Sequence, residues 1–186
     1  MNSPIPTASL DAQDQDVSAQ ETTAQETTLS EPEQHGFEAV GVPAALAKSL
    51  FKRGITAPFP IQVATLPPAL EGRDVCGRAP TGSGKTLAFG IPLMLRVGRA
   101  RPNHPRALVL APTRELAAQI TDELRQLGDS EQTVEAFYGG VGFGNQLRAL
   151  RNGVDVAVAC PGRLADLINQ GHVHLNEVDL VVLDEA

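Results

Sequence analysis

The sequence contains no tryptophan, one tyrosine, two cysteines and no apolar run long enough to cross a membrane. Cys76 and Cys160 are far apart and have no Cys or His at ligand spacing, which argues against a disulfide framework and against a metal site built on them. The N-terminus lacks the basic stretch and apolar run of a signal peptide. We therefore expect a soluble, cytoplasmic protein without a membrane partner.

Residues 1–34 contain no Lys, no Arg and no aromatic residue. They hold seven of the 22 acidic residues, whereas residues 35–186 hold the other 15 together with all 15 Lys and Arg. The net charge of −7 therefore arises in the first 34 residues, and it does not argue against nucleic-acid binding by the rest. A segment of this composition buries too little apolar surface to offset its ordering entropy. We predict a disordered tail over 1–34 and one domain over 35–186.

Short apolar runs alternate with amphipathic stretches from residue 42 onward. Strands are predicted at 74–77, 107–111, 134–137, 154–159 and 178–183, and helices at 43–53, 61–70, 85–97, 114–127, 144–151 and 164–169. The runs 107–111 and 180–183 are apolar on both faces, as parallel strands covered by helices on both sides are. Repeated strand–helix units predict an α/β fold with a doubly wound parallel sheet. Ligands bind beyond the carboxyl ends of such strands, so functional residues are expected directly after each run.

A glycine-rich segment with the P-loop pattern follows the predicted strand 74–77 and precedes a helix. It consists of Ala79, Pro80, Thr81, Gly82, Ser83, Gly84, Lys85 and Thr86, with Ala79 in the place of the first glycine. Gly82 and Gly84 permit backbone angles that other residues avoid, so that several N–H groups and a helix dipole face one anion. Lys85 is expected to reach the β- and γ-phosphates, and the Thr86 hydroxyl to ligate Mg²⁺. The alternative is a turn that contains Lys-Thr by chance, which would not need the strand–loop–helix context.

Asp184 and Glu185 directly follow the apolar run 178–183. At the carboxyl end of that strand they would lie near the P-loop. Asp184 could then hold Mg²⁺ through water, and Glu185 could orient or deprotonate the attacking water. Such a pair alone is more often a solvated turn, but a P-loop about 100 residues upstream favours a catalytic pair. Lys85, Asp184 and Glu185 are the predicted catalytic residues.

Further motifs resemble those of DEAD-box RNA helicases. Residues 54–62 read Gly-Ile-Thr-Ala-Pro-Phe-Pro-Ile-Gln and are preceded, 17 residues before the glycine, by Phe37, as in the family's Q motif. Residues 112–117, 139–140, 161–163 and 184–186 are similar to its motif Ia, its glycine doublet, its motif Ib and the start of the box that names it. The resemblance implies a RecA-like P-loop NTPase domain, a parallel sheet with helices on both faces.

The resemblance also implies a ligand for each motif. ATP would be the nucleotide, with Gln62 reading the adenine edge, Phe37 stacking on the base and Ile55 in the same site, since an amide both donates to and accepts from that edge. Single-stranded RNA would be gripped through its sugar–phosphate backbone, without reading of base sequence. The residues expected to contact RNA are Pro112, Thr113, Arg114, Gly139, Gly140, Pro161, Gly162 and Arg163. Arg163 would offer a charge-assisted fork to phosphate.

Two residues depart from the family pattern. Cys160 stands where Thr is usual, which removes a hydroxyl hydrogen bond to RNA and predicts a modest weakening. Phe59 replaces a common Thr in the Q motif, and we expect this change to be tolerated.

The sequence ends at Ala186, one residue short of Asp-Glu-Ala-Asp. The resemblance implies a Ser-Ala-Thr strand between the strands that carry Lys85 and Asp184, and a second RecA-like domain with arginine fingers. Without these parts we expect unpaired strand edges and a fold that is incomplete at its C-terminus. We also expect weak ATP binding and negligible hydrolysis, because an arginine finger contributes about 10³–10⁵ in rate.

The favoured interpretation is the ATP-binding half of an RNA-stimulated ATPase that locally opens short duplexes. Three alternatives stay open: a passive nucleotide- or RNA-binding fragment, another P-loop enzyme such as a nucleotide kinase, and a related ATPase that acts on DNA. Gln62 with Phe37, and residues 112–117, argue against a kinase, which needs neither.

Overall fold

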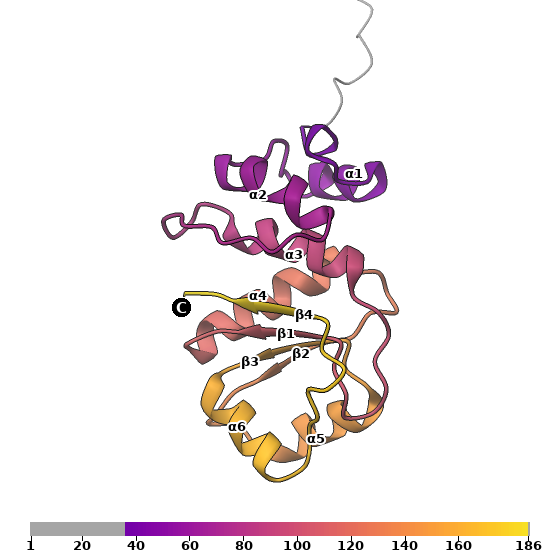
Figure 1. Cartoon of the computed structure of the whole chain (residues 1–186), viewed down its shortest axis with the longest axis vertical. Helices are drawn as coiled ribbons and strands as arrows, with labels where there is room; N and C mark the ends of the chain where they lie inside the picture. The colour runs from indigo at the N-terminus through magenta and orange to yellow at the C-terminus, as the bar shows by residue number, and fades with distance from the viewer. Residues whose placement is uncertain (1–35, 186) are drawn as a thin grey trace, which may run out of the picture. The chain divides into compact units, whose positions relative to one another are not determined.

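The computed structural model describes residues 36–185, so the tail predicted over 1–34 lies outside the described residues. A parallel sheet in the order β2-β3-β1-β4 forms its centre. The strands are β1 (Ala107–Leu110), β2 (Val134–Phe137), β3 (Val156–Ala159) and β4 (Leu180–Leu183). Leu110 pairs with both Ala159 and Leu183, so neighbouring strands end level with one another. All four arrows point the same way in Figure 1, and the residues that follow them therefore gather at one edge.

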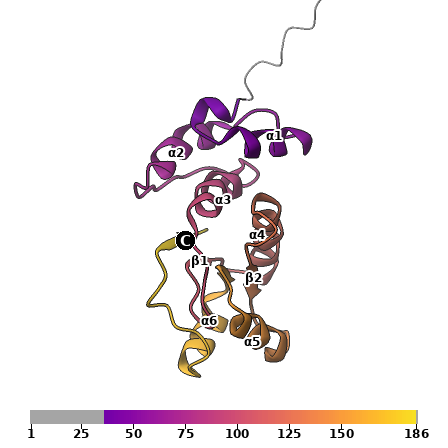
Figure 2. The same cartoon turned by 90° about the vertical axis from the view of Figure 1, so that its right-hand side faces the viewer.

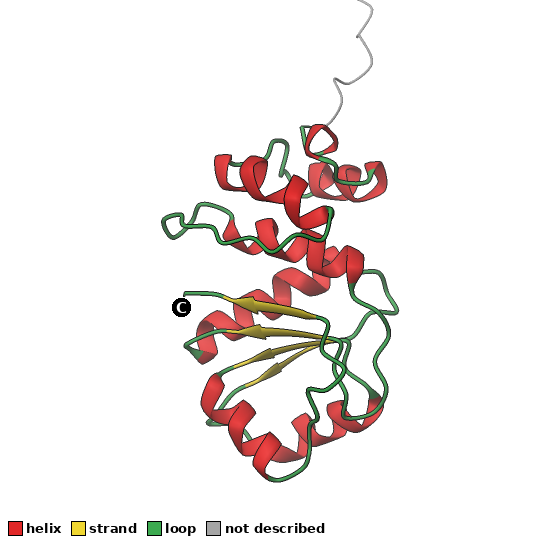
Figure 3. Ribbon diagram, in the orientation of Figure 1, coloured by secondary structure: helices red, strands yellow, loops and turns green. Residues whose placement is uncertain are grey.

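Helices cover the sheet on both faces. Within residues 36–185 they are η1 (Glu38–Val40), α1 (Ala44–Lys52), α2 (Pro60–Leu70), α3 (Lys85–Arg96), α4 (Arg114–Leu127), α5 (Phe143–Asn152) and α6 (Pro161–Asn169). Figures 1 and 2 show α3 and α4 on one face and α5 and α6 on the other, and Figure 3 shows the strands lying between helices. From β1 onward, strands and helices alternate along the chain. The predicted α/β fold is confirmed. None of these helices is long and apolar enough to span a membrane.

Alternate residues of the strands belong to two different hydrophobic clusters, one on each face of the sheet. Ala107 and Val109 of β1 belong to the larger cluster, together with residues of α1 to α4, whereas Leu108 belongs to the smaller one beneath α5 and α6. Each of the three is at most 5% exposed. Burial of a Val or Leu side chain contributes about 1.5–3 kcal/mol, so the inner strands hold the sheet between its two helical layers.

The strand β4 differs from the inner strands. Leu180 and Val182 pack against the larger cluster, but Val181 and Leu183 are 59% and 62% exposed. The prediction that this strand is covered on both faces is therefore wrong. β4 is the last strand of the sheet and pairs only with β1, and the helices that cover Leu108 do not extend over Val181 and Leu183. Within residues 36–185, no strand pairs with the other edge of β4.

The strand predicted at 74–77 is absent. Residues 73–80 run without helix or strand pairing, and Val75 is 42% exposed. A strand needs a neighbour to satisfy its backbone groups, and no strand in residues 36–185 pairs with this segment. The other predicted strands and helices are confirmed, with ends that differ by at most three residues.

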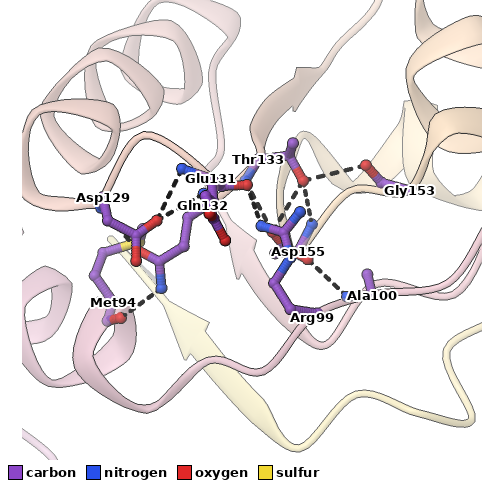
Figure 4. Close-up of polar contacts among 9 residues, drawn as sticks. All are labelled: Met94, Arg99, Ala100, Asp129, Glu131, Gln132, Thr133, Gly153 and Asp155. Atoms are coloured by element: carbon purple, nitrogen blue, oxygen red, sulfur yellow. Dashed lines mark hydrogen bonds and ion pairs between the residues drawn. The ribbon is translucent and has the colours of Figure 1, made fainter.

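Asp155 fixes the amino ends of the inner strands (Figure 4). This residue is 1% exposed and directly precedes β3. Its Oδ2 accepts from the backbone N–H of Thr133 (2.8 Å) and pairs with the guanidinium of Arg99 (2.7 Å), while Oδ1 accepts from the N–H of Ala100 (2.6 Å). Because every neighbour donates to this buried carboxylate, its desolvation is offset. The backbone carbonyl of Asp155 also accepts from the N–H of Ala107 (2.9 Å), so β1, β2 and β3 are tied together at the edge opposite their carboxyl ends.

Candidate nucleotide and nucleic-acid site

The P-loop, residues 79–86, leads into α3, which begins at Lys85. Gly82 and Gly84 have φ values of 79° and 80°, in the left-handed region where a side chain costs about 1–2 kcal/mol. Gly84 is the N-cap of α3, and the first N–H groups of a helix have no intrahelical acceptor. The loop therefore presents backbone donors and the positive end of the helix dipole in one place, as phosphate binding requires.

Two side chains of the P-loop have the contacts expected of an anion site. Lys85 Nζ donates to the carbonyl of Ala79 at 3.1 Å, and within residues 36–185 it forms no salt bridge. Ser83 Oγ is buried without a hydrogen-bond partner in this part of the chain, a state that costs about 1–3 kcal/mol. A phosphate oxygen would give Ser83 its missing partner and Lys85 its counter-charge. The residues present therefore fit the phosphate chain of a nucleotide.

The acidic pair follows β4 at the same edge of the sheet. The N–H of Asp184 donates to the carbonyl of Leu110 (3.0 Å), which continues the β1–β4 ladder by one residue. Partial burial raises the pKa of Asp184; Lys85 opposes this rise and Glu185 adds to it. The effect of Lys85 on the pKa of Asp184 shows that the acidic pair lies near the P-loop. Glu185 is exposed and has φ of 56°, a strained conformation for this residue type and one that is concentrated at functional sites.

A magnesium ion would need ligands from the nucleotide as well as from the protein. No group of three His, Cys, Asp or Glu side chains in residues 36–185 could hold a metal ion. Mg²⁺ in nucleotide sites is held by one or two protein ligands together with phosphate oxygens and water. Half-buried Thr86, in the first turn of α3, and Asp184 supply that number. The donor set fits a metal that arrives with the nucleotide.

Gln62 joins the Q segment, residues 54–62, to the P-loop. It is fully buried, its Nε2 donates to the carbonyl of Gly84 (2.9 Å), and its Oε1 accepts from the N–H of Phe59 (2.8 Å). The structure therefore places Gln62 beside the nucleotide loop, as the resemblance implies. A primary amide has a second N–H and a second lone pair, which the two hydrogen bonds above leave free. Recognition of adenine by Gln62 stays a prediction: it would use these free positions or replace Gly84 or Phe59 as the hydrogen-bond partner.

Phe37 does not present a surface to a base. It is 1% exposed and belongs to the larger hydrophobic cluster, and half-buried Ile55 packs against the same cluster. Stacking requires an open ring face, and the protein covers both faces of Phe37 in this structure. The predicted stacking of adenine on Phe37 stays a prediction, which requires the covered ring to become accessible. Its ring stabilises the core under the Q segment, because an aromatic side chain buries a large apolar area.

Motif Ia and the glycine doublet meet at the carboxyl edge. Thr113 is the N-cap of α4, and its hydroxyl accepts from the N–H of Leu116 (3.2 Å). The exposed guanidinium of Arg114 lies against Gly140, with one terminal nitrogen 3.3 Å from the position of a Cβ there. Its Nε also donates to Glu115 (2.6 Å), which lowers the pKa of that carboxyl. Arg114 and the exposed Gly139–Gly140 backbone thus lie together at this edge.

Arg163 is held inside the protein. It lies in the first turn of α6 and is 9% exposed, and its guanidinium donates to Gln146 Oε1 (2.8 Å) and to the carbonyl of Val141 (3.3 and 3.4 Å). It also lies 4.1 Å from the ring centre of Phe143. The predicted direct fork to phosphate is therefore corrected: these contacts use the guanidinium to brace the loop that follows the glycine doublet.

The remaining predicted RNA contacts lie at the carboxyl edge. Pro112, Pro161 and Gly162 are exposed there. Cys160 is the half-buried N-cap of α6 and makes no side-chain capping hydrogen bond; burial, helped by the charge of Glu115, raises the pKa of its thiol. RNA binding by these residues stays a prediction.

Phe59, which motif reasoning treats as a tolerated change, lies against the P-loop. It is 53% exposed, and its Cδ2 lies 2.7 Å from the position of a Cβ on Gly84. The available signal was its residue type, because an aromatic side chain occupies a helix N-cap where Ser or Thr is favoured.

Comparisons with known proteins agree with this geometry. The sequence model of the family described as DEAD/DEAH box helicase matches residues 59–186. The chain is 52% identical over 161 residues to "DEAD-box ATP-dependent RNA helicase 3B, chloroplastic" of Zea mays, and 50% identical over 152 residues to "DEAD-box ATP-dependent RNA helicase 9, mitochondrial" of Arabidopsis thaliana. These matches cover 83% and 79% of this chain but 22% and 25% of the relatives. The chain thus spans about a quarter of the length of these curated relatives.

Among solved structures, the RNA-helicase Prp28 from Chaetomium thermophilum bound to ADP is similar with a TM-score of 0.73 and 42% identity, over 80% of this chain and 37% of that one. A DEAD box protein from Methanococcus jannaschii gives a TM-score of 0.73 and 35% identity, over 81% of this chain and 41% of that one. The family match spans more than half of the sequence and includes the P-loop and the acidic pair. The chain therefore belongs to the DEAD/DEAH box helicase family.

Proposed function

We propose that the chain is the ATP-binding part of an RNA helicase, in which ATP hydrolysis is coupled to the gripping of one RNA strand. One observation carries this proposal: a glycine-rich loop with an unpaired buried hydroxyl, Ser83 Oγ, lies near Asp184 at the carboxyl edge of the sheet, where Lys85 of the loop affects the Asp184 pKa. Relatives that are named ATP-dependent RNA helicases, and a similar structure bound to ADP, support ATP and RNA as the two ligands.

The phosphate chemistry follows from the P-loop and the acidic pair. The ammonium group of Lys85 would neutralise the β- and γ-phosphates, and the backbone donors of residues 82–86 would hold their oxygens. Thr86 and Asp184 would hold Mg²⁺, which supplies charge neutralisation at the phosphates when bound. Glu185, exposed at the end of β4, would orient or deprotonate the attacking water.

The RNA surface would be the edge formed by the N-terminus of α4 and the glycine doublet. Arg114 supplies an exposed cation there, and Gly139 and Gly140 let a sugar–phosphate backbone approach closely. Contacts of this kind position a strand but carry no sequence information. The proposal therefore specifies single-stranded RNA held without regard to its base sequence.

Fluorescence anisotropy tests the nucleic-acid half of the proposal. Labelled RNA and DNA single strands of equal length and sequence are titrated with the chain, with and without a non-hydrolysable ATP analogue, at several salt concentrations. We expect RNA to bind more tightly. Arg114→Ala should reduce the dependence of log K on log salt by about 0.7, the contribution of one phosphate contact on a single strand. Lys48→Ala, an exposed cation on α1, is the control and should leave the dependence unchanged. Preference for DNA, or an unchanged slope for Arg114→Ala, would contradict the proposal.

A further inference from the structure

Gln146 is a polar side chain in a buried place. It lies in α5 and is 7% exposed, one helical turn before the buried Leu150, which belongs to the smaller hydrophobic cluster. An apolar residue would pack at this position without a polar cost, whereas a buried amide is tolerated only when hydrogen bonds replace those it made with water. The partners of the amide therefore identify what Gln146 contributes.

Both ends of the Gln146 amide are bonded to elements of the proposed RNA surface. Its Nε2 donates to the carbonyl of Tyr138 (3.1 Å), the residue that directly precedes the glycine doublet. Its Oε1 accepts from the guanidinium of Arg163 (2.8 Å), which lies in the first turn of α6. One side chain thus links the glycine doublet to residues 161–163, two segments that are both predicted to contact RNA.

The turn between β2 and α5 has few contacts of its own to hold it. Residues 139–142 are all exposed, and three of them are glycine. A Cβ at the first or the last of these four residues would meet no atom within 4 Å. Glycine also has the most conformational freedom to lose. The turn is therefore held at its start by the bond from Gln146, and in its middle by Arg163, which donates to the carbonyl of Val141.

We propose that Gln146 is a positioning residue for RNA, which holds the Gly139–Gly140 backbone where a sugar–phosphate strand meets it. Gln146 is too deeply buried to contact RNA itself. Its hydrogen bond to Tyr138 instead orders the doublet before RNA arrives, so that binding does not bear the entropic cost of ordering the turn. This inference rests on the proposed function, because it assumes that the glycine doublet contacts RNA. It adds a residue that acts on RNA affinity through the backbone rather than through charge.

The test compares two ligands that use different parts of the carboxyl edge. Labelled single-stranded RNA is followed by anisotropy, and ADP by calorimetry, with the chain and with Gln146→Met, which has a similar length but no amide. We expect RNA to bind about 2- to 12-fold more weakly, the range that corresponds to one hydrogen bond. The factor should be the same at every salt concentration, because no cation is removed. ADP should bind as before. Gln126→Met, which replaces an exposed glutamine of α4, is the control and should leave both affinities unchanged.

A second variant separates positioning from stability. Gln146→Met alone should lower Tm, because it leaves a buried guanidinium and a carbonyl without a partner. Combining it with Arg163→Met replaces both members of the buried pair by apolar side chains, which should restore part of that loss in Tm. The carbonyl of Tyr138 still lacks its donor in the double variant, so RNA affinity should stay reduced while Tm recovers.

Each other outcome has a defined meaning. Equal RNA affinity of the chain and of Gln146→Met would overturn the inference, but the proposed function would stand because RNA still binds. A parallel loss of ADP and RNA affinity would show a general loosening of the fold, which also overturns it. Full recovery of RNA affinity in the double variant would mean that Gln146 serves only to satisfy Arg163, contrary to the inference. If the unaltered chain binds no RNA, the RNA part of the proposed function fails and the inference fails with it.

Discussion

Substitution of Gly84 by Ala perturbs the junction between the Q segment and the P-loop. A Cβ at this position would lie 2.3 Å from Gln62 Nε2 and 2.7 Å from Phe59 Cδ2, both closer than van der Waals contact allows. The φ value of 80° is also unfavourable for alanine. The substitution therefore combines backbone strain with displacement of a buried amide that makes two hydrogen bonds.

The structure allows these two costs to be estimated. Left-handed backbone costs alanine about 1–2 kcal/mol. Displacement of the Gln62 amide leaves buried polar groups without partners, which costs about 1–3 kcal/mol. We expect Gly84→Ala to lower the free energy of unfolding by about 2–5 kcal/mol, a large part of the stability of an ordinary domain.

Urea unfolding followed by circular dichroism measures this loss, and two glycines of the same chain separate its causes. Gly82 has φ of 79° with no atom within 4 Å of a Cβ, so Gly82→Ala should show the backbone cost alone, about 1–2 kcal/mol. Gly144, in α5, also has open space and lacks the positive φ, so Gly144→Ala should be neutral or stabilising. Equal losses for Gly84→Ala and Gly82→Ala would refute the reasoning, since the contact with Gln62 would then contribute nothing.

Three further predictions concern charged residues. Asp184→Asn should raise Tm at pH 7, because a carboxylate whose folded pKa lies above 3.8 opposes folding once ionised; in melts at several pH values the gain should shrink as the pH falls through the folded pKa and vanish well below 3.8. Arg163→Met should lower Tm but leave the salt dependence of RNA binding unchanged, and a slope altered as in Arg114→Ala would show a direct phosphate contact. Asp155→Asn should lower the free energy of unfolding by about 2–3 kcal/mol in urea, because one oxygen that accepts hydrogen bonds becomes a donor; a loss below about 0.5 kcal/mol would contradict its assigned role.

The local sequence pattern was sufficient to predict most of the helices and the inner strands. Helix α4 occupies the predicted residues 114–127, because an apolar stripe, a Thr N-cap and a closing glycine all mark the same bounds. The place of the P-loop was equally predictable, since its glycines have the left-handed angles that the motif demands. These features depend on contacts between residues close in sequence.

The predictions that failed depend on contacts between residues that are distant in sequence. Residues 74–77 and 180–183 have the composition of buried strands, but the first has no pairing partner and the second is covered on one face only. The residues of a motif also do not determine whether a side chain points into the core or toward solvent. Arg163 turns inward to Gln146, and Phe37 packs into the core, while Phe59, taken as a tolerated change, is the exposed ring at the loop.

The central claim is that residues 79–86 bind the phosphates of ATP, and calorimetric titration of the chain with ATP and Mg²⁺ tests it most directly. The account predicts saturable binding at one site, weakened at least about tenfold by Lys85→Ala, because a charge-assisted contact to phosphate is lost. Lys48→Ala should bind like the unaltered chain. Absence of binding, or equal binding by Lys85→Ala, would contradict the claim.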